Sequence, residues 1–152
     1  MSDVNKRRED DSVITINSEG DSLLEQGRYK EALALFEKVL RLDPGRVAAW
    51  KNKALALLLL KTYGEALACY DKVLELNPED SEAWNSKGTC LSRLERREEA
   101  AACFDRALQL APWDKKAWFN KSICFGCLGQ RKEARECYDR AFEIEESKSG
   151  RH

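Results

Sequence analysis

Hydrophobic and polar positions after the first twelve residues follow the period of an amphipathic α-helix. Within residues 81–114, two groups of small or apolar residues each fall on one helical stripe. The first group is Trp84, Gly88, Leu91 and Leu94, and the second is Ala100, Phe104, Ala107 and Leu108. The pattern predicts two packed helices, which form a helical hairpin.

Three residue types mark a period of 34 residues along the chain. The repeated positions are Pro44, Pro78 and Pro112; Trp50, Trp84 and Trp118; and Ala32, Ala66, Ala100 and Ala134. Because proline lacks an N–H and cannot continue the preceding helix, each proline ends one unit before the next begins. The sequence therefore predicts a tandem array of four hairpins, over residues 13–46, 47–80, 81–114 and 115–148.

This unit resembles the tetratricopeptide repeat, a helix–turn–helix of 34 residues with tryptophan, glycine, alanine, aromatic and proline residues at fixed offsets. The third unit carries the pattern most fully, with Trp84, Lys87-Gly88, Leu91, Ala100, Phe104 and Pro112. Ile16 replaces the tryptophan in the first unit, and Glu146 replaces the proline in the fourth. The resemblance implies an all-α fold over residues 13–148, a right-handed α-solenoid (superhelix) of antiparallel helix hairpins.

Small and large residues alternate at the predicted helix contacts. Gly20 and Gly88 would let the two helices of a hairpin approach closely, and the rings of Phe36 and Phe104 would fill the space beside them. Asp80 or Ser81, and Asp114, are placed to cap the helices that follow them.

The two ends of the chain lack the repeated pattern. Residues 1–12 contain seven charged side chains and little to bury, so we expect a flexible N-terminal tail there. Residues 149–152 are expected to form a flexible C-terminus. After Ile144 too few residues remain for another helix over the fourth hairpin, whose apolar edge would then be exposed.

The resemblance implies a concave surface lined by the first helix of each hairpin, where members of the family usually bind an extended peptide or a partner's helix. The expected groove residues are Lys51, Asn52, Leu55, Leu58, Leu59, Asn85, Thr89, Arg93, Trp113, Lys116, Phe119, Asn120 and Ile123. In the first repeat the same positions are Asn17, Asp21, Leu24 and Glu25.

The stretch WKNKALALLLL, residues 50–60, carries more leucine than the repeat requires. Trp50, Ala54 and Leu57 form the family's inward set, so the other leucines form a second stripe, made of Leu55, Leu58 and Leu59. We expect this stripe to face the groove; the alternative is that the N-terminal segment or the first repeat covers it. Phe119 and Ile123 form a second apolar patch, which predicts a protein or peptide ligand with two apolar anchors around a polar middle.

Two further groups of residues invite a chemical interpretation. Asn52 and Asn120 lie two periods apart and resemble the amide ladders that hold a peptide backbone in some family members; the alternative is that they tie one helix to the next turn. Cys124 and Cys127 form a C-x-x-C pair, so a metal or redox protein is a distant alternative. Five of the six cysteines recur at the repeat spacing, which favours packing.

Composition narrows the remaining functions. The 26 basic and 27 acidic residues nearly cancel, and no basic stripe accompanies the aromatic residues, so we expect no nucleic-acid binding. The longest apolar run, Ala54 to Leu60, is far shorter than the roughly 20 residues that span a bilayer, so we expect no membrane insertion. Six cysteines without a secretory signal favour reduced thiols and a cytoplasmic location.

Nothing in the sequence predicts an enzyme or a cofactor, since it has no Gly-rich phosphate loop and its one histidine is the last residue. The sequence predicts a non-catalytic interaction scaffold, or adaptor, that binds another protein in its concave groove. The runner-up is a self-assembly module that associates through the uncapped fourth repeat. In that respect we expect a monomer with a tendency to weak homo-oligomerisation.

Overall fold

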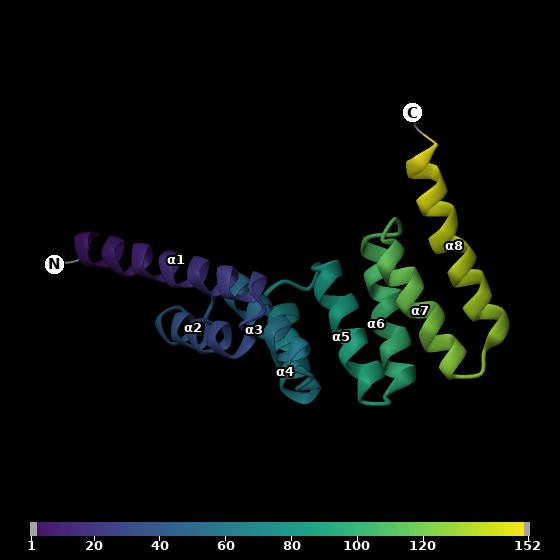
Figure 1. The fold of residues 1–152 in the computed structure, drawn as a ribbon, viewed down its shortest axis with the longest axis horizontal. Helices are drawn as coiled ribbons and strands as arrows, with labels where there is room; N and C mark the ends of the chain where they lie inside the picture. Colours follow the sequence, from purple (N-terminus) through teal and green to yellow (C-terminus); the bar gives the residue numbers. More distant parts are fainter. Residues whose placement is uncertain (1–2, 151–152) are drawn as a thin grey trace. The chain divides into compact units, whose positions relative to one another are not determined.

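The computed structural model describes residues 3–150, and that part of the chain contains α-helices and no strand (Figure 1). The helices are α1 (Asp3–Glu25), α2 (Tyr29–Leu42), α3 (Val47–Leu59), α4 (Tyr63–Leu76), α5 (Ser81–Arg93), α6 (Arg97–Leu110), α7 (Lys115–Cys127) and α8 (Arg131–Ser149). Successive helices pack in pairs, α1 with α2, α3 with α4, α5 with α6 and α7 with α8. The predicted all-α fold of helical hairpins is confirmed.

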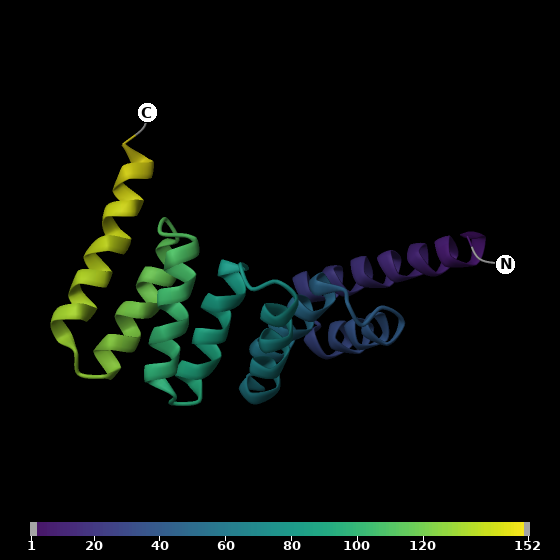
Figure 2. The same ribbon diagram turned by 180° about the vertical axis from the view of Figure 1, so that it is seen from behind.

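The chain divides into two compact units, residues 1–77 with α1–α4 and residues 78–152 with α5–α8. In the first unit α3 packs on α2 and reaches α1, and in the second unit α7 packs on α6 and reaches α5. Each unit therefore contains two hairpins stacked in chain order, which Figures 1 and 2 show for the second unit from opposite sides. Burial of small and aromatic residues at these contacts stabilises each unit.

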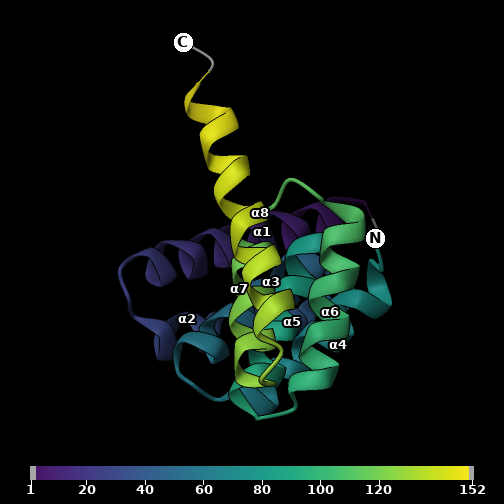
Figure 3. The same cartoon turned by 90° about the vertical axis from the view of Figure 1, so that its right-hand side faces the viewer.

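Proline sets the length of the second helices. α2, α4 and α6 each have 14 residues and end two positions before Pro44, Pro78 and Pro112. In the fourth repeat Glu146 stands at the proline position, and α8 continues to Ser149 over 19 residues. Its C-terminal part extends beyond α7, as Figure 3 shows most clearly.

The N-terminal segment corrects one expectation from the sequence. α1 begins at Asp3, so residues 3–12, which we expected to form a flexible tail, are helical although their side chains are exposed. The packed part of α1, where Val13 is buried, provides a nucleus from which the helix extends at one hydrogen bond per residue. Ser149 likewise belongs to α8 and is followed by Gly150, while residues 151–152 lie outside the described part.

The hairpin turns share a backbone feature that the sequence pattern did not reveal. The residue two positions after the end of each first helix has a positive φ. These residues are Gly27 (75°), Lys61 (61°), Glu95 (62°) and Gly129 (77°). These residues recur every 34 positions, so one left-handed residue closes each turn. Only glycine adopts this conformation without steric cost.

Candidate peptide-binding surface

A hydrogen bond anchors each of the last three first helices to the turn before it. The indole Nε1 of the repeated tryptophan donates to the carbonyl oxygen of the repeated proline at 2.8 Å, in the pairs Trp50–Pro44, Trp84–Pro78 and Trp118–Pro112. A lysine ammonium three residues on lies 5.4–5.7 Å from each tryptophan ring centroid. These contacts fix the orientation of α3, α5 and α7, and the constant interval from proline to tryptophan was the signal for them.

Aspartate caps start two of these helices. The Asp80 side chain accepts a hydrogen bond from the Ala83 N–H at 3.0 Å, and Asp114 accepts from the Lys116 N–H at 3.0 Å. The predicted caps at Asp80 and Asp114 are thus confirmed. Because carboxylate caps satisfy backbone N–H groups that have no partner within the helix, they stabilise the ends of α5 and α7.

The repeated asparagines connect neighbouring first helices. Asn120 Nδ2 on α7 donates to Asn85 Oδ1 on α5 at 3.1 Å, and Asn52 Nδ2 on α3 donates to Asp21 on α1. Asn17 also donates to Asp21, at 3.5 Å. Burial, followed by the charge of Glu25, raises the pKa of the Asp21 carboxyl above its ordinary value. The amides therefore join α3 to α1 and α7 to α5. This differs from the alternative given above, in which each asparagine bonds to the next turn.

The first unit contains a hollow of about 450 Å³ between α1 and α3, here called the leucine hollow. Its lining is Asp21, Leu24, Glu25, Asn52, Leu55 and Leu59. Leu55 is 38% exposed and Leu59 is 41% exposed, whereas Ala54 and Leu57 on the same helix are buried. The structure thus brings two of the three predicted groove leucines together with the predicted positions of the first repeat.

Leu58 and Lys51 are placed differently from their predicted neighbours. Both are half-buried on α3, and neither belongs to the lining of the leucine hollow. Around the helix, residue 58 falls between the inward position of Ala54 and the outward position of Leu55. Of the three leucines predicted to form one stripe, Leu55 and Leu59 therefore line the leucine hollow and Leu58 does not.

The second unit contains a hollow of about 250 Å³ between α5 and α7, here called the isoleucine hollow. Four predicted groove residues line it, namely Thr89, Arg93, Asn120 and Ile123, together with Arg97 and both cysteines of the C-x-x-C pair. Ile123 is 53% exposed. This surface combines an exposed apolar side chain with two guanidinium groups.

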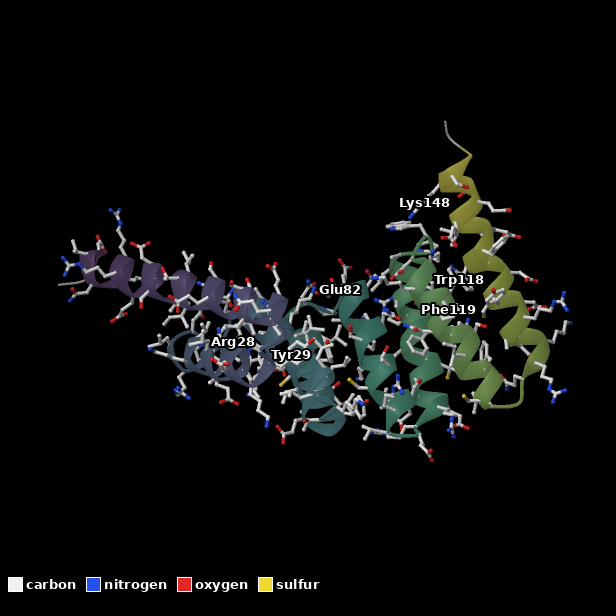
Figure 4. The ribbon with its side chains drawn as sticks, viewed as in Figure 1. Arg28, Tyr29, Glu82, Trp118, Phe119 and Lys148 are labelled. Carbon is white, nitrogen blue, oxygen red and sulfur yellow. The ribbon has the colours of Figure 1, made fainter. Side chains whose placement is uncertain are left out.

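A wider hollow of about 800 Å³ contains the remaining polar groove residues of the second unit. Asn85, Trp113 and Lys116 line it with residues from the starts of α5 and α7 and the end of α8. Figure 4 shows Glu82 near the start of α5 and Lys148 near the end of α8, and both belong to this lining. Both signs of charge are therefore present on its walls.

Phe119 belongs to a fourth hollow, between α7 and α8. It lines a hollow of about 400 Å³, here called the edge hollow, with Tyr138, Ala141 and Phe142 among its walls. The ring centroids of Phe119 and Tyr138 lie 6.2 Å apart. Phe119 and Ile123, predicted as one apolar patch, therefore line two different hollows.

The cysteines differ in exposure. Cys124 is buried, and its Sγ donates to the Arg97 carbonyl oxygen at 3.1 Å, whereas Cys127 is exposed at the end of α7. Burial raises the pKa of the Cys124 thiol, which favours the protonated donor over a thiolate ligand or nucleophile. Within residues 3–150, no group of three or more His, Cys, Asp or Glu side chains is arranged to hold a metal ion.

Comparison with known proteins defines the class. The tetratricopeptide repeat profile matches residues 17–80 and 62–115, and a second profile of the same description matches residues 115–148. The chain belongs to the tetratricopeptide repeat family, and as a member of it the chain is a protein-interaction scaffold. No helix in the described part of the chain has the length and apolar character needed to cross a bilayer.

Several solved structures of one repeat protein, MamA, are similar to the chain. MamA from Desulfovibrio magneticus RS-1 has a TM-score of 0.85 at 27% identity, covering 89% of this chain and 76% of that one. A double mutant of MamA RS-1 has a TM-score of 0.87 at 26% identity, with 95% and 81% covered. A further MamA crystal structure has a TM-score of 0.86 at 20% identity, with 90% and 80% covered. No curated protein matches the sequence.

Proposed function

We propose that this chain is a non-catalytic adaptor whose first helices bind an extended segment of another protein. The observation that carries the proposal is the leucine hollow, where Leu55 and Leu59 remain 38% and 41% exposed. Burying a leucine side chain completely is worth about 1.5–3 kcal/mol relative to leaving it exposed. An apolar side chain of a ligand in this hollow would bury the exposed parts of Leu55 and Leu59, and that burial would contribute to the binding free energy.

The packing of α3 supports a role for these leucines in binding. Ala54 and Leu57 are buried, and Trp50 is bonded to Pro44, so the contacts that the repeat needs are made without Leu55 or Leu59. Leu55 and Leu59 both line one hollow, and apolar side chains that are grouped in a concave surface are typical of interaction sites.

Charge beside the two hollows indicates which ligands would fit. Asp21 and Glu25 line the leucine hollow, so a basic residue next to the apolar anchor is favoured there. Arg93 and Arg97 line the isoleucine hollow beside Ile123, so an acidic residue is favoured at that position. A single ligand with two apolar anchors that reaches both hollows stays a prediction.

Other sequence predictions also stay predictions within this proposal. Family membership favours a scaffold over an enzyme. We also expect that the chain needs no cofactor, binds no nucleic acid and works in the cytoplasm. These expectations rest on its composition and cysteine content.

Selection from a displayed library of random peptides on the immobilised chain tests the proposal. We expect enriched peptides to carry a branched or aromatic apolar residue beside lysine or arginine, and to be lost when the target is the Leu55→Asp, Leu59→Asp variant. Leu76→Asp is the matched control, because Leu76 is 40% exposed in the same unit and is not among the residues lining the leucine hollow. Enriched peptides that bind the double variant as well as the unchanged chain would refute the proposal.

Self-assembly is the second candidate function, and the exposed rings of Tyr138 and Phe142 on α8 favour it. Exposed rings are also expected where a helix of a different protein docks, so we rank this candidate below the adaptor. Light scattering over a range of concentrations tests it: a mass that rises with concentration, and that Phe142→Asp returns to the monomer value, would establish self-association.

A further inference from the structure

Two aromatic rings on α8 are exposed at positions that are buried in the earlier second helices. Tyr138 is 51% exposed and Phe142 is 53% exposed. The equivalent residues, one or three periods earlier, are buried: Phe104 (1%) and Phe36 (0%) for the first ring, Leu108 (7%) and Leu40 (9%) for the second. The face of α8 that carries them is therefore a stacking face without a covering helix in the described part of the chain.

The covering helices have a common chemistry. Leu40 on α2 packs with Ala49 and the partly buried Trp50 of α3, and Leu108 on α6 packs with Ala117 and Trp118 of α7. In both units an alanine followed directly by tryptophan covers the second helix. The small residue permits close approach, and the indole supplies apolar area.

An ion pair accompanies each of these two contacts. The acidic residue that follows the buried ring faces a lysine of the covering helix: Glu37 with Lys53 at 3.6 Å, and Asp105 with Lys121 at 2.5 Å. In both covering helices the lysine lies three positions after the tryptophan. Asp139 follows Tyr138 in the same way, and its ion pair, with Arg135 at 3.9 Å, lies within α8 at the surface.

The edge hollow lies on this face, with a volume of about 400 Å³ between α7 and α8. Phe119, Tyr138 and Phe142 supply its apolar wall, and an ion pair between Lys115 and Glu145 at 2.8 Å joins the two helices at its rim. The face therefore has an apolar surface for a covering helix. It also carries Asp139, the equivalent of Glu37 and Asp105, which pair with a lysine of the covering helix in the earlier hairpins.

We propose that this face of α8 binds a helix of another protein that carries a small residue, then an aromatic residue, then lysine three positions later. The helix would stack on α8 as α3 stacks on α2 and as α7 stacks on α6, with its lysine at Asp139. This site goes beyond the proposed groove function, because its main contacts are on α8 and it includes no residue of the leucine hollow, although it shares Phe119 of α7 with the predicted groove.

Burial and charge disfavour a first helix from a second copy of this chain as the occupant. The helices that carry the alanine–tryptophan–lysine pattern already bury their alanine, namely Ala49, Ala83 and Ala117. α1, the remaining first helix, has Thr15, Ile16 and Glu19 at the corresponding positions. Glu19 would lie beside Asp139, at the place where the other covering helices put a lysine. The two carboxylates would repel each other.

A synthetic peptide of residues 80–95 serves as the probe, with Gly88→Ala and Cys90→Ala to support a helix. It carries the pattern in Ala83, Trp84 and Lys87. Gly88 contacts the ring of Phe104 in its own hairpin, so its replacement leaves the stacking face of the peptide unchanged. Fluorescence anisotropy with the full chain measures binding.

We expect saturable binding that Asp139→Lys weakens about fivefold, as is usual for a partly exposed ion pair, and that a Lys87→Glu peptide restores in that variant. Phe142→Asp should abolish binding, and its unchanged circular dichroism would show that the fold is intact. The Leu55→Asp, Leu59→Asp variant should bind the probe normally, which separates this site from the leucine hollow.

Three results would overturn the inference. The first is no binding of the probe to the full chain. The second is binding that survives Phe142→Asp, which would show that the peptide displaces α5 of the chain and does not bind at α8. The third is a dimer of the chain that Phe142→Asp dissociates and the probe cannot compete with, which would make a second copy the occupant.

Discussion

The ring of Phe104 in α6 lies so close to Gly88 in α5 that a Cβ atom on residue 88 would be 2.6 Å from its Cε1. Phe36 and Gly20 have the same relationship in the first hairpin, with a distance of 2.5 Å. Both rings are fully buried, so neither can turn aside into water. The glycine is therefore the feature that lets the two helices of these hairpins close around an aromatic ring.

Gly88→Ala should lower the free energy of unfolding by about 1–3 kcal/mol, the usual cost of adding a methyl group to a filled core. Urea denaturation measures it. Gly126→Ala is the matched control: it also lies in a helix, no atom comes within 4 Å of a Cβ built there, and the change should stabilise by up to about 1 kcal/mol. Equal stability of Gly88→Ala and the unchanged chain would contradict this packing.

Lys61 and Glu95 hold a left-handed backbone at the turn position where Gly27 and Gly129 stand in the other two hairpins. Lys61→Gly and Glu95→Gly should each raise the free energy of unfolding by about 0.5–1 kcal/mol, because glycine removes the steric cost of positive φ but loses more entropy on folding. Thermal denaturation checks this. Gly129→Ala should have the opposite sign, and a stabilising effect there would show that the turn tolerates a side chain.

Trp118→Phe should destabilise the second unit by about 1 kcal/mol, because it removes the N–H that bonds the Pro112 carbonyl oxygen while keeping an aromatic ring. Trp113→Phe provides the comparison, since Trp113 is largely exposed and its replacement should change stability by less than about 0.5 kcal/mol. The two variants are measured by urea denaturation. Equal effects at the two positions would remove the anchoring role of the indole.

Stability should fall at alkaline pH. Burial raises the pKa of the Cys90 thiol from its ordinary 9.0 to about 12. Between these values the unfolded chain releases the proton and the folded chain keeps it, so the contribution is fully present below about pH 9 and falls by about 1.4 kcal/mol per pH unit above it.

Urea denaturation at pH 8 and pH 10 therefore distinguishes the unchanged chain from Cys90→Ala. The variant should lose about 1.4 kcal/mol less between the two pH values, since one buried thiol no longer resists ionisation. Burial also raises the pKa of Cys69, Cys124 and Cys137, so part of the alkaline loss should remain. An identical loss in both proteins would show that the Cys90 thiol is not protected.

The repeated residues made the fold predictable, and the exceptions have physical causes. Proline, tryptophan and alanine act through backbone geometry and close packing, so their spacing identifies the hairpins directly. Residues 3–12 are helical rather than a flexible tail, because low hydrophobicity argues against a packed core but not against a helix that extends from one. The left-handed turn position has no clear sequence signal, because only two of its four residues are glycine.

The candidate site was predictable where it depends on one helix and less so where it depends on two. Leu55 and Leu59 could be assigned from the stripe on α3 alone, since the inward set of that helix was already known. Phe119 and Ile123 lie on adjacent turns of α7, yet α8 gives Phe119 a partner in Tyr138. That contact depends on how the fourth hairpin closes, which periodicity does not specify.

The most direct test of the adaptor proposal is the dissociation constant of a peptide selected on the chain, measured by calorimetry against three proteins. The unchanged chain and Leu76→Asp should bind equally, and Leu55→Asp should bind on the order of tenfold more weakly, a difference of about 1.4 kcal/mol. Equal affinity of Leu55→Asp and the unchanged chain for every selected peptide would contradict the account.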